Sequence, residues 1–217
     1  MPELLIKQFE IGPMQNFVYF IGDQNTKQAL LVDPAWDIKS LLEEASKAGI
    51  AIKGILVTHG HFDHTNGVEE LLKNYDIPVY INEAEMDFFK FSWGKENIKK
   101  VSSGDKLKIG NVEVQFIHTP GHTPGSQCFL IQNNLVSGDT LFIDACGRCD
   151  LPGGNVEEMF DTIYNKLMKM PDNTLIFPGH NYAHITQDLL INQKRTNPYM
   201  QYDNLMSFVG KRMPNLK

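Results

Sequence analysis

The sequence predicts an α/β fold built from two halves, each a β-sheet covered by helices, with the two sheets packed together and the helices outside. Three observations support this prediction. Short apolar runs bounded by turn residues recur along the chain, amphipathic helical patterns separate them, and the alternation of strands with helices occurs twice. The chain has 217 residues, 42% hydrophobic and 21% charged, and no linker-like stretch divides it. We therefore expect a single domain over residues 1–217.

The first half is expected to begin with three short strands, because turn residues at Gly12-Pro13 and Gly22–Asn25 separate its apolar runs. Asp37 is a predicted helix N-cap, and apolar residues at helical spacing follow it up to a stop at Gly49. Residues 83–100 have no clear pattern. The predicted elements are strands at Leu4–Phe9, Phe17–Ile21, Ala29–Val32, Ile50–Val57 and Val79–Ile81, and helices behind Asp37 and over Val68–Asn74.

The second half repeats this order. Turns at Gly110-Asn111 and Asn133-Asn134 separate apolar runs that predict strands. Asn155 is an N-cap pattern in front of an amphipathic stripe that continues to Met170. A last buried strand precedes a helical segment over about 186–213, with a break at Pro198. The predicted strands are Leu107–Ile109, Val112–Ile117, Gln127–Ile131, Leu135–Val136 and Leu175–Phe177.

Charge and composition exclude several function classes. The net charge of −6 argues against general binding to nucleic acid or anionic membranes. The apolar stretches are shorter than the ~20 residues that a membrane span needs. The start of the chain has no basic region followed by an apolar one, and three cysteines are too few for a disulfide framework. We therefore expect a cytoplasmic protein without nucleic-acid or membrane partners, and the oligomeric state stays open.

The segment Thr58–His64, directly after a predicted buried strand, indicates a metal site. Four side chains that can ligate a metal, His59, His61, Asp63 and His64, fall within six residues. Imidazole nitrogen and carboxylate oxygen are ligands that zinc accepts without any thiolate. The restrictive spacing favours a metal site over a histidine-rich loop with incidental metal affinity.

Three later segments each place one more potential ligand after a predicted strand. They carry His122 in Thr119–Ser126, Asp139 in Ser137–Phe142 and His180 in Phe177–His180. Each segment alone is typical of an ordinary turn. The four segments in this order indicate one site assembled from both halves of the chain.

This set of residues resembles the metallo-β-lactamase superfamily, whose hallmark is His-x-His-x-Asp-His followed by separated His, Asp and His ligands. The resemblance spans nearly the whole chain and implies a four-layer αββα sandwich. Further segments resemble the glyoxalase II-like branch, the hydroxyacylglutathione hydrolases: Ile11–Asn16, Leu31–Pro34, Gly147-Arg148 with Asp150, Pro152–Gly154 and Lys194–Tyr199.

The resemblance implies a binuclear hydrolase that holds two divalent metal ions, zinc in the first place, although iron and manganese accept the same ligands. It assigns His59, His61 and His122 to the first ion, Asp63, His64 and His180 to the second, and Asp139 to a bridging position. A metal-bridging hydroxide, oriented by Asp63, is then the nucleophile. The implied reaction is cleavage of an acyl thioester such as S-D-lactoylglutathione, whose thiol leaves easily.

Other activities of the superfamily stay open at this stage. A persulfide dioxygenase would use a single iron held by His59, His122 and Asp139, and a lactonase or another hydrolase would use the full ligand set. A nuclease is disfavoured by the acidic balance. Full glyoxalase II chains also carry a longer C-terminal region with basic glutathione contacts, so recognition of a glutathione conjugate stays open.

Substrate contacts are expected from Arg148 and Tyr182. Arg148 resembles a basic residue that contacts a substrate carboxylate in the glyoxalase II-like branch, and an ion pair with Asp150 is an equal alternative. Tyr182 would lend its hydroxyl to the pocket or pack against it.

The remaining histidines and cysteines are expected to play other roles. His118 and His184 fit no ligand position of the resembling pattern. Cys146-Gly147-Arg148-Cys149 is interpreted as a tight loop near the metal site rather than a redox pair, because no second cysteine pair accompanies it.

Overall fold

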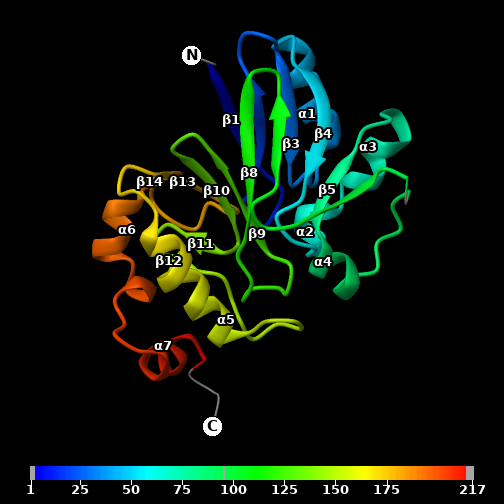
Figure 1. Ribbon diagram of the computed structural model, residues 1–217. Coiled ribbons are helices and arrows are strands. Elements are labelled where there is room, and N and C mark those ends of the chain that lie inside the picture. The colour runs from blue at the N-terminus through cyan, green and yellow to red at the C-terminus, as the bar shows by residue number, and fades with distance from the viewer. Residues whose placement is uncertain (1–2, 95, 214–217) are drawn as a thin grey trace.

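The computed structural model describes residues 3–94 and 96–213, in which two six-stranded sheets pack against each other (Figure 1). The two ends of the predicted domain 1–217 and residue 95 lie outside the described residues. The first sheet is antiparallel over its first three strands and parallel over the rest. Its strands, in spatial order, are β1 (Leu4–Ile11), β2 (Asn16–Asp23), β3 (Gln28–Val32), β4 (Ala51–Leu56), β5 (Val79–Asn82) and β6 (Ile98–Val101).

The second sheet contains one parallel pair, β10 with β13, among antiparallel neighbours. Its strands, in spatial order, are β14 (Asp188–Leu189), β13 (Leu175–Pro178), β10 (Asn134–Gly138), β9 (Gln127–Ile131), β8 (Val112–His118) and β7 (Lys106–Ile109). A small two-stranded sheet joins β11 (Leu141–Phe142) to β12 (Ala145–Cys146).

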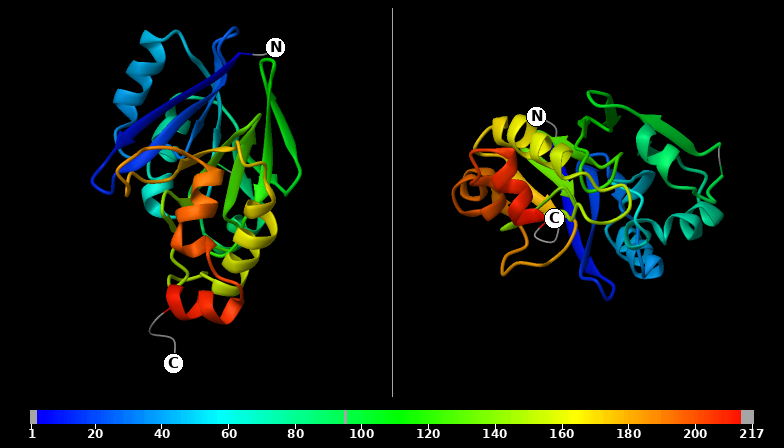
Figure 2. Two further views of the ribbon diagram at one scale, coloured as in Figure 1. Left: turned by 90° about the vertical axis from the view of Figure 1, so that its left-hand side faces the viewer. Right: turned by 90° about the horizontal axis from the view of Figure 1, so that it is seen from below.

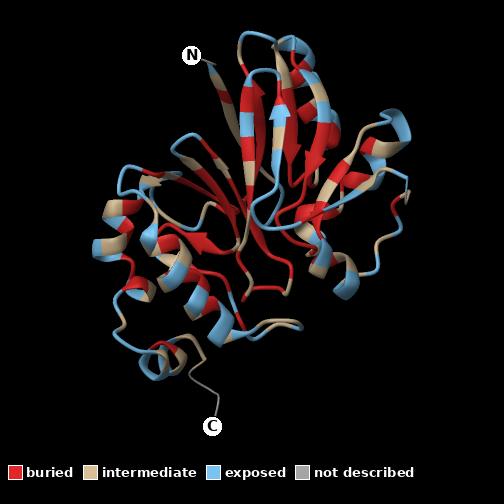
Figure 3. Cartoon of the chain, in the orientation of Figure 1, coloured by how far each residue is buried: buried red, intermediate tan, exposed pale blue. Residues whose placement is uncertain are grey.

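Helices cover the outer face of each sheet, which confirms the predicted four-layer sandwich (Figure 2). Three clusters of buried apolar side chains separate the four layers: one under the first set of helices, one between the sheets and one under the second set. The buried strands lie in the centre and the exposed helix faces point outward (Figure 3). The helices are α1 (Ile38–Lys47), α2 (Phe62–Thr65), α3 (Val68–Asn74) and α4 (Glu83–Phe88) in the first half, and α5 (Val156–Asp161), α6 (Leu190–Thr196) and α7 (Leu205–Arg212) in the second.

Strand β2 shows how the sequence builds these layers. All of its residues are buried, so both faces must pack against apolar neighbours. Val18 and Phe20 point into the cluster beneath the first set of helices, while Phe17, Tyr19 and Ile21 point into the cluster between the sheets. The period-two alternation of a strand therefore supplies two cores from one apolar run.

The predicted helix caps are confirmed. The Asp37 carboxylate accepts a hydrogen bond from the Ser40 amide (3.1 Å), and the Asn155 side chain accepts from the amides of Glu157 and Glu158. Beyond α5 the chain continues as a wide π-helical turn over Thr162–Lys166 and a 3₁₀ turn over Leu167–Lys169. The predicted stripe that runs to Met170 therefore folds as three kinds of helix in succession.

The C-terminal segment differs in part from the prediction of helix over 186–213. It begins with β14, which pairs with the start of β13 because that edge of the sheet is open there. Helix α6 then ends before the predicted break at Pro198, and α7 follows. The unassigned stretch 83–100 contains α4 and most of β6. Among the described residues, no helix combines the length and the apolar character that a membrane crossing requires.

Candidate metal centre

The segment Thr58–His64 lies at the end of β4, where it turns into the short helix α2. His61 is the N-cap of this helix, and Asp63 and His64 lie in its single turn. Asp33, which follows β3, accepts hydrogen bonds from the Thr58 amide (2.7 Å) and the Thr58 hydroxyl (2.5 Å). Because β3 and β4 are parallel neighbours, their ends meet, and this pair of bonds holds the histidine segment against the sheet.

The other three predicted residues come from the second sheet. His122 lies in the loop between β8 and β9, Asp139 directly follows β10, and His180 is two residues beyond β13. Strands β10 and β13 run parallel, so Asp139 and His180 arrive at the same edge. The structure therefore brings all seven residues together, from both sheets.

One group consists of His59, His61 and His122, whose candidate ligand atoms all lie within 4.8 Å of one another. His61 Nδ1 lies 3.0 Å from His122 Nε2. A second group consists of Asp63, His64 and His180, and its closest contact joins His64 Nε2 to His180 Nε2 at 3.1 Å. This division is the one that the resemblance implied, and the ligand roles themselves stay a prediction.

Asp139 lies between the two groups. Its Oδ2 is 3.6 Å from His122 Nε2 and 3.4 Å from His180 Nε2, and its Oδ1 is 3.4 Å from His64 Nε2. The carboxylate thus faces both groups at once, as the predicted bridging position requires.

In four of the five histidines, Nδ1 lies within hydrogen-bond distance of another protein group, so that Nε2 is the ring nitrogen directed at the centre. Such contacts fix the ring orientation and raise the basicity of a ligating imidazole. The Nδ1 partners are Thr58 Oγ1 for His59 (3.0 Å), Asp33 Oδ2 for His64 (3.0 Å), the Arg148 carbonyl for His122 (2.8 Å) and the Met14 carbonyl for His180 (2.9 Å).

The protonation of the centre fits a metal ion. Burial, reinforced by the neighbouring histidines, lowers the pKa of His59 well below its usual value and that of His61 to about 4, so both rings are neutral. Burial also lowers the pKa of His64, but Asp139 and Asp33 outweigh it and raise that pKa to about 9. A cation bound here would replace the His64 proton.

Two polar atoms provide an independent test of fit. Among the described residues, His59 Nε2 and Asp139 Oδ1 are buried without a hydrogen-bond partner. Unpartnered buried polar atoms are costly, and a cation bound between the two groups would satisfy both of them. The neutral imidazoles of His59 and His61, a carboxylate whose pKa the nearby histidines hold well below its usual value, and these two unpartnered atoms together suit divalent cations.

Two residues that position the proposed ligands were not predicted from the sequence. Asp33 joins Thr58 to His64, as described above; the segments Leu31–Pro34 and Ile11–Asn16 entered the prediction only as part of the resemblance. Asn16 donates from Nδ2 to Asp63 Oδ2 (2.9 Å) and accepts at Oδ1 from Trp36 Nε1 (2.8 Å). In the sequence, each of the two could have been found as a polar residue at the end or start of an apolar run.

Glu85 is a third positioning residue that was not predicted. This fully buried carboxylate accepts hydrogen bonds from the amides of Gly60 (2.5 Å) and Gly125 (2.7 Å) and from Thr123 Oγ1 (2.9 Å). It therefore ties the segment that carries His59 and His61 to the loop that carries His122. Burial raises its pKa, although these three bonds oppose the shift.

A cavity of about 330 Å³ opens onto the centre. Arg148 and Tyr182, the two predicted substrate contacts, both line it. The Arg148 side chain forms the alternative ion pair, with two 2.9 Å hydrogen bonds to Asp150. The Tyr182 ring stacks on His180 at a centroid distance of 4.6 Å, and burial raises the pKa of its hydroxyl to about 12.

The remaining histidines and cysteines lie outside the two groups. His118 contacts the Pro124 carbonyl through Nε2 (2.8 Å), and His184 is exposed. Cys128, Cys146 and Cys149 are free, buried thiols in the core beneath the second set of helices.

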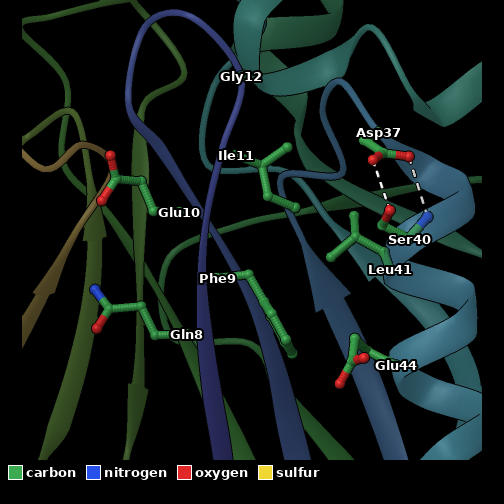
Figure 4. Close-up of a pocket in the computed structure, with 9 residues that line it drawn as sticks. All are labelled: Gln8, Phe9, Glu10, Ile11, Gly12, Asp37, Ser40, Leu41 and Glu44. Carbon is green, nitrogen blue, oxygen red and sulfur yellow. Dashed lines mark hydrogen bonds between the residues drawn. The ribbon is translucent and has the colours of Figure 1, made fainter.

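A larger cavity, of about 560 Å³, lies between β1 and α1 (Figure 4). Phe9 and Ile11 point towards α1, whereas Gln8 and Glu10 point away from it. None of the predicted site residues lines this cavity. The smaller cavity over the histidines and aspartates is therefore the candidate active site, because only it combines access with candidate ligands.

Comparison with known proteins agrees with this geometry. The Metallo-beta-lactamase superfamily matches residues 11–180. The probable polyketide biosynthesis zinc-dependent hydrolase BaeB of Bacillus velezensis is 32% identical over 197 residues, which cover 91% of this chain and 87% of that protein. The hydroxyacylglutathione hydrolase of Dictyostelium discoideum is 33% identical over 180 residues, covering 77% of this chain and 63% of that protein.

The crystal structure of ETHE1 from Myxococcus xanthus has a similar fold. It superposes with a TM-score of 0.87 at 27% identity, covering 98% of this chain and 92% of that one. The strand order, the two groups of candidate ligands and these matches agree with one another. The chain is a member of the metallo-β-lactamase superfamily.

Proposed function

We propose that the protein is a metal-dependent hydrolase of acyl thioesters that works with two divalent cations, zinc in the first place. One observation carries the proposal: two groups of three ligand-capable side chains share the Asp139 carboxylate at the floor of an open cavity. The zinc-dependent hydrolase BaeB and the hydroxyacylglutathione hydrolase among the relatives support both the metal and the reaction class.

Two bound divalent cations would supply a water molecule whose pKa is lowered towards about 7, and with it a nucleophile at neutral pH. The chain's own residues hold and orient the reactants. Asn16 fixes the Asp63 carboxylate, which lines the cavity and can accept a proton from a hydrogen-bonded water. The Nδ1 contacts of four of the five imidazoles keep the candidate ligand atoms preorganised.

A thioester suits this site better than a substrate with a poor leaving group. A departing thiol has a reference pKa near ~8.5 and needs no strong general acid. Tyr182, with its raised pKa, stays neutral and can only offer a hydrogen bond. S-D-lactoylglutathione is one substrate of the proposed class.

Metal analysis of the native protein, beside a thioester hydrolysis assay, tests this proposal. Asp139→Ala removes the carboxylate shared by both groups, so we expect bound metal to fall and activity to drop at least ~100-fold. Asp161→Ala, at an exposed position of α5, is the matched control and should retain both. Full activity of Asp139→Ala would overturn the metal assignment.

A mononuclear iron persulfide dioxygenase is the second candidate. His122 Nε2 and His59 Nε2 lie 3.6 and 4.0 Å from Asp139 Oδ2, a grouping that could also hold a single iron. One iron per chain in the native protein, together with oxygen uptake and sulfite formation from glutathione persulfide, would favour this activity. Zinc with thioester hydrolysis and no oxygen uptake would exclude it.

A further inference from the structure

The cavity over the proposed metal centre has an apolar rim. Three hydrophobic side chains around it are strongly exposed: Phe62 retains 72% of its accessible surface, Tyr182 55% and Met14 46%. They come from three separate segments of the chain, and Phe142 and Leu151 extend the same lining. Exposed apolar side chains gathered around one cavity beside a reactive centre are typical of a site that binds an apolar group.

Apart from the candidate ligands, few charged side chains line the cavity. Arg148 is the one lysine or arginine among the described lining residues, and Asp150 binds its guanidinium with two 2.9 Å hydrogen bonds. Neighbouring Arg212 does not replace it, because its Nε donates to the Gly147 carbonyl (2.8 Å) and its guanidinium lies over the Tyr199 ring.

The Arg148 pairing is built into a fixed loop. The Arg148 carbonyl accepts the hydrogen bond from His122 Nδ1, so the backbone at this position is tied to the proposed metal centre. The side chain then reaches only to Asp150, two residues away, in a planar bidentate geometry that suits guanidinium and carboxylate. Asp150 thereby occupies two of the five guanidinium N–H donors and neutralises the positive charge, which weakens the attraction of Arg148 for a substrate carboxylate.

We propose that this pocket selects acyl thioesters whose flanking groups are apolar and uncharged. Phe62 is then the main apolar contact, and Asp150 neutralises the Arg148 guanidinium and so weakens its attraction for anionic substrates. The inference rests on the proposed thioester hydrolysis and narrows its substrate class. Glutathione brings two carboxylates, and the cavity leaves them without a free cation.

The test uses the metal-loaded protein and two matched series of substrates. Acetyl, butanoyl and hexanoyl thioesters are prepared on N-acetylcysteamine, a neutral thiol, and on glutathione. We expect kcat/KM to rise with acyl length by up to about fourfold per methylene group. At equal acyl length we expect the neutral thiol ester to be preferred at least ~10-fold, because no cavity cation pairs with the glutathione carboxylates.

Two sets of variants assign the effects to residues. Phe62→Ala should flatten the dependence on acyl length, whereas Met206→Ala, a similarly exposed apolar change on α7, should leave it as it is. Asp150→Ala should raise kcat/KM for the glutathione esters about fivefold relative to the neutral esters, the range of an exposed ion pair. The double variant with Arg148→Ala should lose that gain.

The outcomes separate the two proposals. Hydrolysis with no length dependence and a preference for the glutathione esters overturns the inference on selectivity but supports thioester hydrolysis. Absence of hydrolysis of every ester by the metal-loaded protein overturns both. An unchanged ester preference in Asp150→Ala overturns the role given to that residue.

Discussion

The pKa shifts of two buried carboxylates in this protein have opposite directions, because different groups surround them. Asp139 faces imidazoles, and although burial alone would raise its pKa, His64, His180 and His59 hold that pKa well below its usual value. Glu85 faces only backbone amides and a hydroxyl, so burial prevails and its pKa is raised. The first carboxylate suits a cation, while the second serves to join two loops.

Removing the Glu85 carboxylate should loosen the centre without touching a proposed ligand. Glu85→Ala leaves the buried amides of Gly60 and Gly125 unpaired, at about 1–3 kcal/mol each. We expect the free energy of unfolding, measured in urea, to fall by about 2–5 kcal/mol, and metal affinity to fall with it. Asp87→Ala on the same helix removes only an exposed ion pair with Lys100 and should change stability by less than about 0.5 kcal/mol. Equal stability of the two variants would contradict the joining role.

The three thiols should be unreactive in the folded protein. Burial raises the pKa of Cys128 and of Cys149 to about 11 each, and that of Cys146 further still. Because the thiolate is the nucleophile, a pKa of 11 leaves about one thiol in a thousand ionised at pH 8. Titration with a thiol reagent at pH 8 should detect no fast-reacting cysteine before denaturation and three after it. A rapid reaction of two native thiols would instead support a redox role for the Cys-x-x-Cys loop.

At the scale of elements, the irregular helix after Asn155 holds the loop that carries His122. Thr162 Oγ1, in the π-helical turn, donates to the Pro120 carbonyl (2.8 Å), and Lys166 Nζ donates to the His118 carbonyl (2.9 Å). A regular α-helix would place these side chains at other angles, so the wide turn positions them for these two hydrogen bonds. Helix geometry and ligand position are therefore coupled.

Gly121, in that loop, packs closely against α5. It has a φ of +132°, and a Cβ there would lie 2.5 Å from the backbone of Met159. Gly121→Ala should cost about 2–4 kcal/mol, from overpacking and from the backbone conformation together. Gly49→Ala is the control: its φ is +66° but nothing lies within 4 Å, so it should cost only about 1 kcal/mol. Thermal unfolding of both variants measures the difference, and equal shifts would show that close packing plays no part.

At the scale of the whole molecule, the proposed ligands connect the two sheets. His59, His61, Asp63 and His64 belong to the first half, whereas His122, Asp139 and His180 follow strands of the second. A bound ion would therefore crosslink the layers on either side of the central core. Binding energy at such a site becomes folding energy, because the unfolded chain has no preformed site.

Metal removal should consequently destabilise the entire fold. A ligand present at a hundred times its Kd stabilises the native state by about 2.7 kcal/mol, so chelation should lower the melting temperature by several degrees. Calorimetry with and without chelator measures the shift. Asp161→Ala should retain the shift and Asp139→Ala should lose most of it. If chelation leaves the melting temperature of the unmodified protein unchanged, that result would argue against a crosslinking ion.

The sequence by itself was sufficient for the order of the longer strands and helices, for the caps at Asp37 and Asn155 and for the seven residues that meet at the centre, because periodicity, capping and ligand spacing are local signals. It was insufficient for α4, β6 and β14, because segments of two to six residues are too short to show a clear periodicity. The tertiary structure alone revealed Glu85, Asn16 and Asp33 as positioning residues, and it showed that the Arg148–Asp150 ion pair, one of two alternatives offered by the sequence, is formed. The physical reason is that a buried polar group takes its role from the donors and acceptors that folding brings to it, and sequence spacing does not record them.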